Sequence, residues 1–174
     1  MKKVTFTLFL ALFALIVHAQ DKKDQEIIAD SEAAKADFLK DDPEMAKLFN
    51  DSYGYIILPN VGKGGLGVGV AAGNGVAFEK GDRIGFVKMT QVTVGFQAGG
   101  QAYSEVVFFE NEEAFQRFKD NKVEMSAQVS AVAAASGASK DAKYVNGVSV
   151  FTRTKGGLMY EASVGGQQFK FRKL

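Results

Sequence analysis

Residues 54–81 read GYIILPNVGKGGLGVGVAAGNGVAFEKG, and in the middle of this stretch glycine alternates with aliphatic residues. Glycine occupies every second position from 65 to 69, and Leu or Val occupies the positions between. Successive side chains of a β-strand point to opposite faces, so this strand would have one apolar face and one nearly bare face. Glycine weakens a strand unless another group must approach its backbone closely. The pattern therefore predicts a strand against which an aromatic ring, another backbone or a ligand packs.

Further strands are expected on both sides of the alternating segment. The apolar run 53–58 is typical of a strand, and Pro59 is expected to end it. Asn74-Gly75 is the strongest signal for a two-residue hairpin turn, because both residues tolerate positive φ. Three more strands are expected over residues 83–91, 92–101 and 103–110.

The C-terminal third carries weaker local signals. Gly165-Gly166 favours a second hairpin, which would pair Glu161 with Lys170. The segment from Ser126 to Ser139 is ambiguous, because its alanines favour a helix while its alternation of small residues permits a strand.

Helical patterns precede and interrupt the strands. Residues 21–40 have the spacing of an amphipathic helix, and Asp42-Pro43 supplies a cap and a first-turn proline for a second helix. Asn111 is a good cap for a third helix, with acidic residues in its favourable first turn. The apolar positions expected to pack inward are Ile27, Ala34, Phe38, Met45, Leu48, Phe49, Phe115 and Phe118.

Four segments, in this order, carry a resemblance to a known family. They are residues 54–81, GFQAGGQAYSEVVFF (95–109), MSAQVSAVAAASG (125–137) and FTRTKGGLMYEASVGG (151–166). Together they resemble the core of the SYLF domain family, lipid-binding domains of exported bacterial proteins and of eukaryotic membrane-trafficking and actin-associated proteins. The resemblance implies non-catalytic lipid binding, and it favours a strand for residues 126–139. Phosphoinositide specificity and actin binding belong to the eukaryotic branches.

The first residues have the layout of a secretory signal peptide. Lys2 and Lys3 precede an apolar run over residues 4–17, and Ala19 ends a small-residue cleavage site. The run is too short to span a bilayer. We therefore expect an exported protein, periplasmic or extracellular, that is soluble or peripherally attached to a membrane.

These signals predict one compact α+β domain. Its parts are a signal peptide over residues 1–19, an N-terminal helical segment over 20–52 and a SYLF-like β-rich domain over 53–174. The expected architecture is a glycine-rich antiparallel β-sheet or partly closed barrel with N-terminal helices and one internal helix.

The composition excludes most catalytic chemistry. His18 is the only histidine, there is no Cys and no Trp, and cleavage after Ala19 would remove His18. Disulfides, most zinc, copper and haem sites, and Ser-His-Asp or Cys-His catalysis are then excluded. Gly62–Gly67 matches G-x-G-x-x-G, but a β-rich segment follows instead of the helix that a dinucleotide site requires. We expect no enzymatic activity, no cofactor and no metal.

Charge is placed unevenly along the chain. Residues 20–51 hold 10 acidic and 5 basic residues, whereas residues 153–174 hold 5 basic residues and one acidic residue. The acidic N-terminal segment argues against its contact with an anionic bilayer. The basic end is either a solvated edge strand protected by charge or a docking site for anionic head groups. A nucleic-acid binder would show a broader basic excess, so no nucleic-acid partner is expected.

The predicted function is non-catalytic binding of an anionic lipid or membrane surface. Four residues are the candidate lipid-binding site: Lys63, Arg153, Lys155 and Arg172. The alternative is a structural or protein-interaction module of the cell envelope, with an envelope protein as partner and no lipid site.

Overall fold

The computed structural model describes residues 2–120, 131–133, 138–157 and 166–174. The chain begins with two helices, continues with two very long strands, and ends with a third helix and three shorter strands. The elements are α1 (Lys2–Asp41), α2 (Met45–Asp51), β1 (Gly54–Glu79), β2 (Asp82–Phe109), α3 (Glu112–Lys119), β3 (Ala131–Ala133), a 3₁₀ turn (Ala138–Asp141), β4 (Val148–Gly157) and β5 (Gln167–Lys173).

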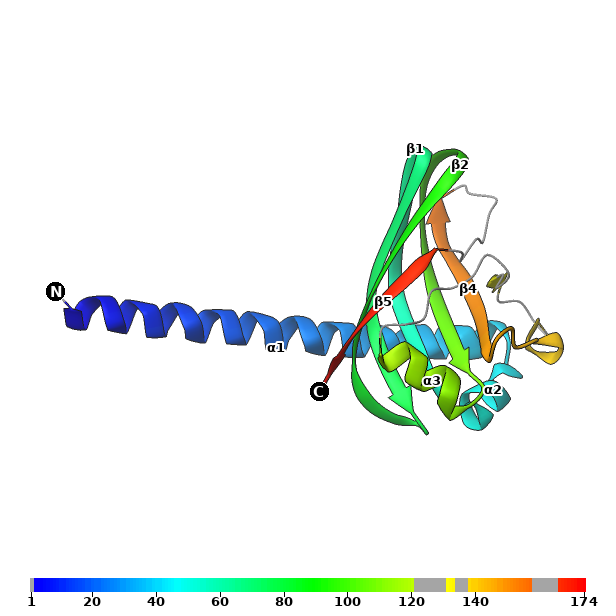
Figure 1. Cartoon of the computed structure of the whole chain (residues 1–174), viewed down its shortest axis with the longest axis horizontal. Coiled ribbons are helices and arrows are strands. Elements are labelled where there is room, and N and C mark those ends of the chain that lie inside the picture. Colours follow the sequence, from blue (N-terminus) through cyan, green and yellow to red (C-terminus); the bar gives the residue numbers. More distant parts are fainter. Residues whose placement is uncertain (1, 121–130, 134–137, 158–165) are drawn as a thin grey trace.

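The sheet is organised by one long antiparallel hairpin. β1 and β2 pair along their whole length, and the other strands join β2: β4 pairs with its second half and β5 with its first half, both antiparallel. β3 adds to β4 in parallel. Figure 1 shows the hairpin bent over at its upper end, with α1 running across the sheet. The predicted α+β class is confirmed, and the sheet formed by the described residues is not closed into a barrel.

The predicted turn at Asn74-Gly75 is wrong. Asn74 lies inside β1, directly opposite Lys88, and the chain reverses at Lys80-Gly81 instead. Both turn residues have positive φ, 53° and 89°, as the favoured two-residue hairpin turn requires. The long-range pairing of β1 with β2 therefore overrides a local turn signal. The three strands expected over residues 83–91, 92–101 and 103–110 likewise form one strand, β2, because they pair with β1 along its whole length.

Two glycines in the first and last parts of β1 are closely packed, whereas close packing at the alternating glycines 65–69 stays a prediction. A Cβ atom built on Gly75 would lie 2.0 Å from the carbonyl oxygen of Ile57, and one built on Gly54 would lie 2.8 Å from that of Phe78. β1 therefore doubles back so that its first and last parts touch through their backbones. Pro59 does not end the strand, because the ladder continues after a register shift between Leu58 and Val61.

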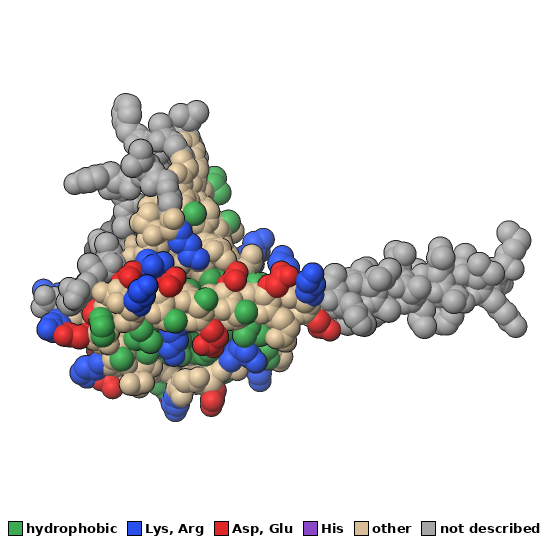
Figure 2. Space-filling view, turned by 180° about the vertical axis from the view of Figure 1, so that it is seen from behind, with side chains coloured by type: hydrophobic (Ala, Val, Ile, Leu, Met, Phe, Trp, Pro, Cys, Tyr) green, Lys and Arg blue, Asp and Glu red, His purple; other side chains and the backbone are tan. Residues whose placement is uncertain are grey.

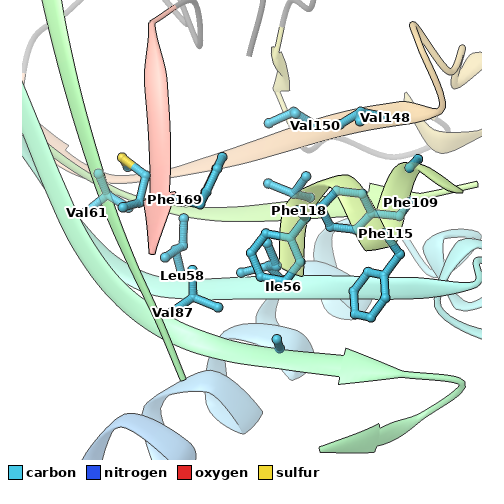
Figure 3. Packing of buried hydrophobic residues seen from close by; sticks show 14 of the residues in the cluster. Ile56, Leu58, Val61, Val87, Phe109, Phe115, Phe118, Val148, Val150 and Phe169 are labelled. Carbon is cyan, nitrogen blue, oxygen red and sulfur yellow. The ribbon is translucent and has the colours of Figure 1, made fainter. Parts of the chain in front are cut away.

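The sheet buries a hydrophobic cluster on each face. The inner cluster lies under α3, and Figure 3 shows Phe115 and Phe118 of this helix packed against Phe109 of β2 and close to Ile56 of β1. The outer cluster lies under α1 and α2. Its buried members are Ala34, Phe38, Met45, Phe49, Tyr55, Ile57, Val76, Phe78, Phe86, Val106, Phe108 and Phe151.

The helix predictions are largely confirmed. The expected helix 21–40 lies within α1, and Asn111 caps α3 by accepting a hydrogen bond of 3.0 Å from the Ala114 amide. Asp42 has a different role from the expected one. Its carboxylate accepts from the amides of Glu44 and Ser139, so it ties the turn before α2 to the 3₁₀ segment.

Some sequence predictions fall on residues outside the described ranges. Within 126–139 only β3 and the start of the 3₁₀ turn are described, and the pairing of Glu161 with Lys170 lies outside these ranges.

Signal-peptide cleavage also stays a prediction. Figure 1 shows the first half of α1 projecting away from the sheet. In the described part of the chain, no helix is both long and apolar enough to cross a membrane.

Candidate functional site

Arg153 joins β4 to α1. Its guanidinium group donates to Asp41 Oδ2 through Nε at 2.5 Å and to Asp37 Oδ2 through Nη1 at 3.0 Å. The side chain is only 26% exposed. Two carboxylates of the acidic N-terminal segment therefore already hold this predicted lipid-binding residue.

Arg172 makes a second junction, between β5 and α1. Its Nη2 donates to both carboxylate oxygens of Asp24 at 2.8 and 2.9 Å, and the guanidinium lies over the Phe86 ring with its carbon 4.5 Å from the centroid. About half of the Arg172 side chain remains exposed. It is therefore paired within the molecule and still accessible from outside.

The other two predicted residues lie in different surroundings. Lys155 on β4 donates to Asn60 Oδ1 at 2.9 Å in an exposed contact. Lys63 on β1 is buried, and its ammonium group has no hydrogen-bond partner among the described residues. The four predicted residues thus lie on three strands, and their surroundings range from a buried interior to an exposed surface.

A basic groove lies where α1 meets the first half of β2. It has a volume of about 240 Å³, and four of its side chains are basic while only Asp24 is acidic. Its lining residues are Lys23, Asp24, Ile27, Asn74, Phe86, Val87, Lys88, Lys170, Phe171 and Arg172.

Two lysines of this basic groove stand directly opposite each other. Lys88 on β2 and Lys170 on β5 are cross-strand partners, and both side chains are exposed. Within the described ranges, neither forms an ion pair. Like charges in directly opposed positions destabilise a sheet, so the arrangement costs stability unless an anion binds there.

The inner face carries a buried polar group above the hydrophobic cluster. Gln167 of β5 donates to Glu105 Oε2 of β2 at 3.0 Å, and both residues are fully buried. Burial raises the pKa of Glu105 to about 7, although the Gln167 hydrogen bond lowers it in part. Burial, and then the Glu105 charge, also raises the pKa of Tyr103. This hydrogen bond connects β5, which pairs with the first half of β2, to the second half of β2.

A larger cavity of about 680 Å³ lies beside α2. Its charged lining is largely paired within the protein, because Lys140 contacts Glu44 at 2.7 Å and Lys47 pairs with Asp51. Three acidic and two basic residues line this cavity, so its lining lacks the basic excess of the groove described above. The described residues also contain no cluster of three or more potential metal ligands.

Sequence reasoning missed Lys23 and Lys88 as site residues. It also read the acidic segment 20–51 and the basic segment 153–174 separately, although the structure pairs them through Arg153 and Arg172. The signal that could have linked them was the complementary charge of the two segments.

Comparison with known proteins finds a family match and a related curated protein. Residues 90–173 match the Ysc84 family, described as Las17-binding protein actin regulator. The chain is also 28% identical over 128 residues to Beta cell expansion factor A of Aeromonas veronii, in an alignment that covers 73% of this chain and 49% of that protein. The chain thus spans about half the length of this curated relative. These matches confirm the resemblance to the SYLF family that was drawn from the sequence, over residues 90–173 for the family match.

Proposed function

We propose that this protein is an exported, non-catalytic module that binds lipid at a membrane surface through anionic head groups. Its family supports a lipid-binding or actin-regulator-like module. Export, to the periplasm or beyond the cell, follows from the signal-peptide pattern of residues 1–19. The anionic head group is the part of the proposal that depends on the geometry of the basic groove.

The observation that carries the proposal is that Lys88 and Lys170 face each other without an ion pair among the described residues. A phosphate group in the basic groove would relieve the repulsion between these two ammonium groups and would also face Lys23 and Arg172. Lysine holds phosphate as a point charge, and arginine holds it through two parallel hydrogen bonds. Apolar Ile27 and Phe86 line the same groove and leave room for the carbon atoms next to the phosphate.

The four residues chosen from the sequence take unequal parts in this proposal. Arg172 lines the basic groove and would exchange Asp24 for a phosphate oxygen. Arg153 and Lys155 lie on β4, where Arg153 mainly attaches α1. Lys155 would add positive charge at the exposed surface, whereas Lys63 is buried and lies outside the lining of the basic groove.

The alternative is a structural or protein-interaction module of the envelope. The description of the Ysc84 family as an actin regulator that binds Las17 supports protein binding in general. An acidic envelope protein would then be the partner of the basic groove.

Vesicle co-sedimentation separates the two functions. We expect wild-type protein to sediment with vesicles that contain phosphatidylglycerol, not with pure phosphatidylcholine vesicles, and to dissociate as salt is raised. Replacing Lys88 and Lys170 by Gln should weaken binding by about 30-fold, because each lysine near an anionic surface contributes about 1 kcal/mol. The matched control replaces two exposed lysines elsewhere, Lys40 and Lys143, by Gln and should change affinity little. A wild-type protein that ignores anionic vesicles at low salt would favour the protein-interaction module.

A further inference from the structure

Three neighbouring strand segments present a continuous exposed surface beyond α1. In residues 70–74 of β1, 88–92 of β2 and 168–170 of β5, every second residue is exposed and the residues between them are buried. We call this surface the bare face. Its residues are Val70, Ala72, Asn74, Lys88, Thr90, Val92, Gln168 and Lys170.

The bare face is ordered into three rows that cross the strands. Val70 stands opposite Val92, and these two form an apolar row. The middle row holds Ala72, Thr90 and Gln168, and the third row holds Asn74, Lys88 and Lys170. Apolar, neutral and basic side chains therefore follow one another along the strands, and none of the eight residues is acidic.

The apolar row is unusual for this molecule. Val70 and Val92 are 53% and 61% exposed, and with Leu174 they are the large hydrophobic side chains exposed in the described residues. Single exposed hydrophobic residues are ordinary on protein surfaces, but here two β-branched residues touch across a strand pair next to a basic row. Figure 2 shows charged side chains crowded along α1, whereas the described part of the hairpin that rises beyond α1 is mostly tan, with a few green side chains and with basic side chains near α1.

We propose that the bare face is the surface that lies on an anionic bilayer, with Val70 and Val92 entering the boundary between head groups and acyl chains. This inference rests on the proposed lipid-binding function and adds the orientation of the protein on the membrane. Lys88 and Val92 are four positions apart on β2, which corresponds to about 13 Å along the strand. When the sheet is inclined to the membrane, the valines enter the membrane to a depth of about 5–10 Å, as interfacial elements do. The lysines then still reach the lipid phosphates.

Charge complementarity favours a bilayer over a second copy of this chain. A symmetric dimer formed through the bare face would place this surface against a copy of itself, which also holds no acidic residue. Lys88 and Lys170 of each copy would then gain no opposite charge, and their mutual repulsion would remain. An anionic bilayer supplies both negative charge for the basic row and an apolar phase for the valines.

A single introduced tryptophan tests the orientation directly, because the chain contains no Trp. In Val92→Trp, we expect vesicles containing phosphatidylglycerol to shift the fluorescence to shorter wavelength, and bromine-labelled acyl chains to quench it. Lys143→Trp, at an exposed position away from the bare face, should show neither change. Val70→Trp repeats the measurement if Val92→Trp lowers the melting temperature.

A matched pair of variants tests the contribution of the apolar row. Val70→Ser combined with Val92→Ser should weaken vesicle binding roughly tenfold or more while both lysines remain. Leu174→Ser is the control, since Leu174 is 62% exposed but lies outside the bare face, and its affinity should not change.

The outcomes distinguish the inference from the function beneath it. If wild-type protein binds no vesicles, the proposed function fails and the orientation with it. If wild-type protein binds but the tryptophan of the Val92→Trp variant stays in water and the serine variants bind equally well, the orientation is overturned while binding through charge stands. A concentration-dependent shift of the Val92→Trp fluorescence without vesicles would assign the bare face to a second copy and also overturn the inference.

Discussion

Arg153 and Lys170 belong to the same basic C-terminal segment and lie on the same sheet, yet their surroundings are opposite. Arg153 lies where α1 covers the outer face, and it contacts Asp37 and Asp41. Lys170 lies where α1 no longer covers that face, opposite Lys88 and without an ion pair in the described residues. One region is charge-matched and covered, whereas the other is charge-unmatched and bare.

The contrast shows that a count of charges along a segment does not identify a binding site. Some of the basic residues bind α1 to the sheet, and others remain available to an external partner. Arg172 stands between the two groups, because it pairs with Asp24 and also lines the basic groove. Variants of either region, or of the sheet that carries both regions, test this difference.

The largest effect is expected for Gly75→Val, which breaks the doubled hairpin that carries both regions. The new Cβ atom would lie 2.0 Å from the Ile57 carbonyl oxygen, which is backbone and cannot rotate away. We expect a loss of more than about 3 kcal/mol in the free energy of unfolding, measured by urea denaturation, because ordinary overpacking already costs about 1–3 kcal/mol. Gly62→Val is the control, since its Cβ would meet nothing within 4 Å. Equal stability of the two variants would contradict the close approach.

Glu105→Gln tests the interior that supports both regions. The folded protein holds the pKa of Glu105 near 7, above the ordinary 4.5. The folded state therefore favours the protonated form of Glu105. The contribution of this preference to the free energy of unfolding is complete below pH 4.5 and is lost as the pH rises to about 7. Relative to the variant, wild-type protein should lose roughly 3 kcal/mol between about pH 4 and about pH 8. Denaturant titrations at both pH values measure this difference, and parallel pH profiles would contradict it.

Arg153→Gln and Lys170→Gln compare the two regions directly. Arg153→Gln should lower stability by about 1 kcal/mol, because it removes two charge-assisted hydrogen bonds that are partly exposed. Lys170→Gln should leave stability unchanged or raise it by a few tenths of a kcal/mol, because it ends the repulsion with Lys88. Lys170→Gln should weaken vesicle binding more than Arg153→Gln does. Thermal melts and co-sedimentation of the same samples decide the matter, and equal stability losses would show that the two regions do not differ.

The smallest effect is expected for Asp24→Asn, which would release Arg172 from α1. Loss of one partly exposed ion pair should cost less than about 1 kcal/mol of stability. Vesicle affinity should rise about fivefold, because one more cation becomes available to head groups. Glu32→Gln, an exposed position on the same helix, removes the same charge without freeing Arg172. A rise in affinity equal to that of the control would mean that net charge alone is responsible.

The paired charges also revise one expectation drawn from the sequence. From the sequence, Arg153 belongs to a basic end that is either a solvated edge strand or a docking site for anionic head groups, but in the structure two carboxylates of α1 hold it. A change of Arg153 to Glu would place three carboxylates together at α1. A binding defect in that variant would therefore combine loss of affinity with loss of stability, which makes the Lys88 and Lys170 variants the cleaner test.

The amino-acid sequence by itself determined the local features of this protein. The alternation of glycine with aliphatic residues predicted a strand, the apolar stripes predicted which helix faces are buried, and Asn111 predicted the start of α3. These follow from backbone sterics and from periods of two or 3.6 residues, which act within a few positions of the chain.

Only the tertiary structure decided which distant residues meet. It moved the hairpin turn from Asn74-Gly75 to Lys80-Gly81, because pairing along the whole of β1 outweighs one favourable turn. It also placed Asp37 and Asp41 on Arg153, more than a hundred residues away, and left Lys88 facing Lys170. Strand register and helix docking set these contacts, so the division of like charges into structural and available ones depends on three-dimensional packing and not on local sequence.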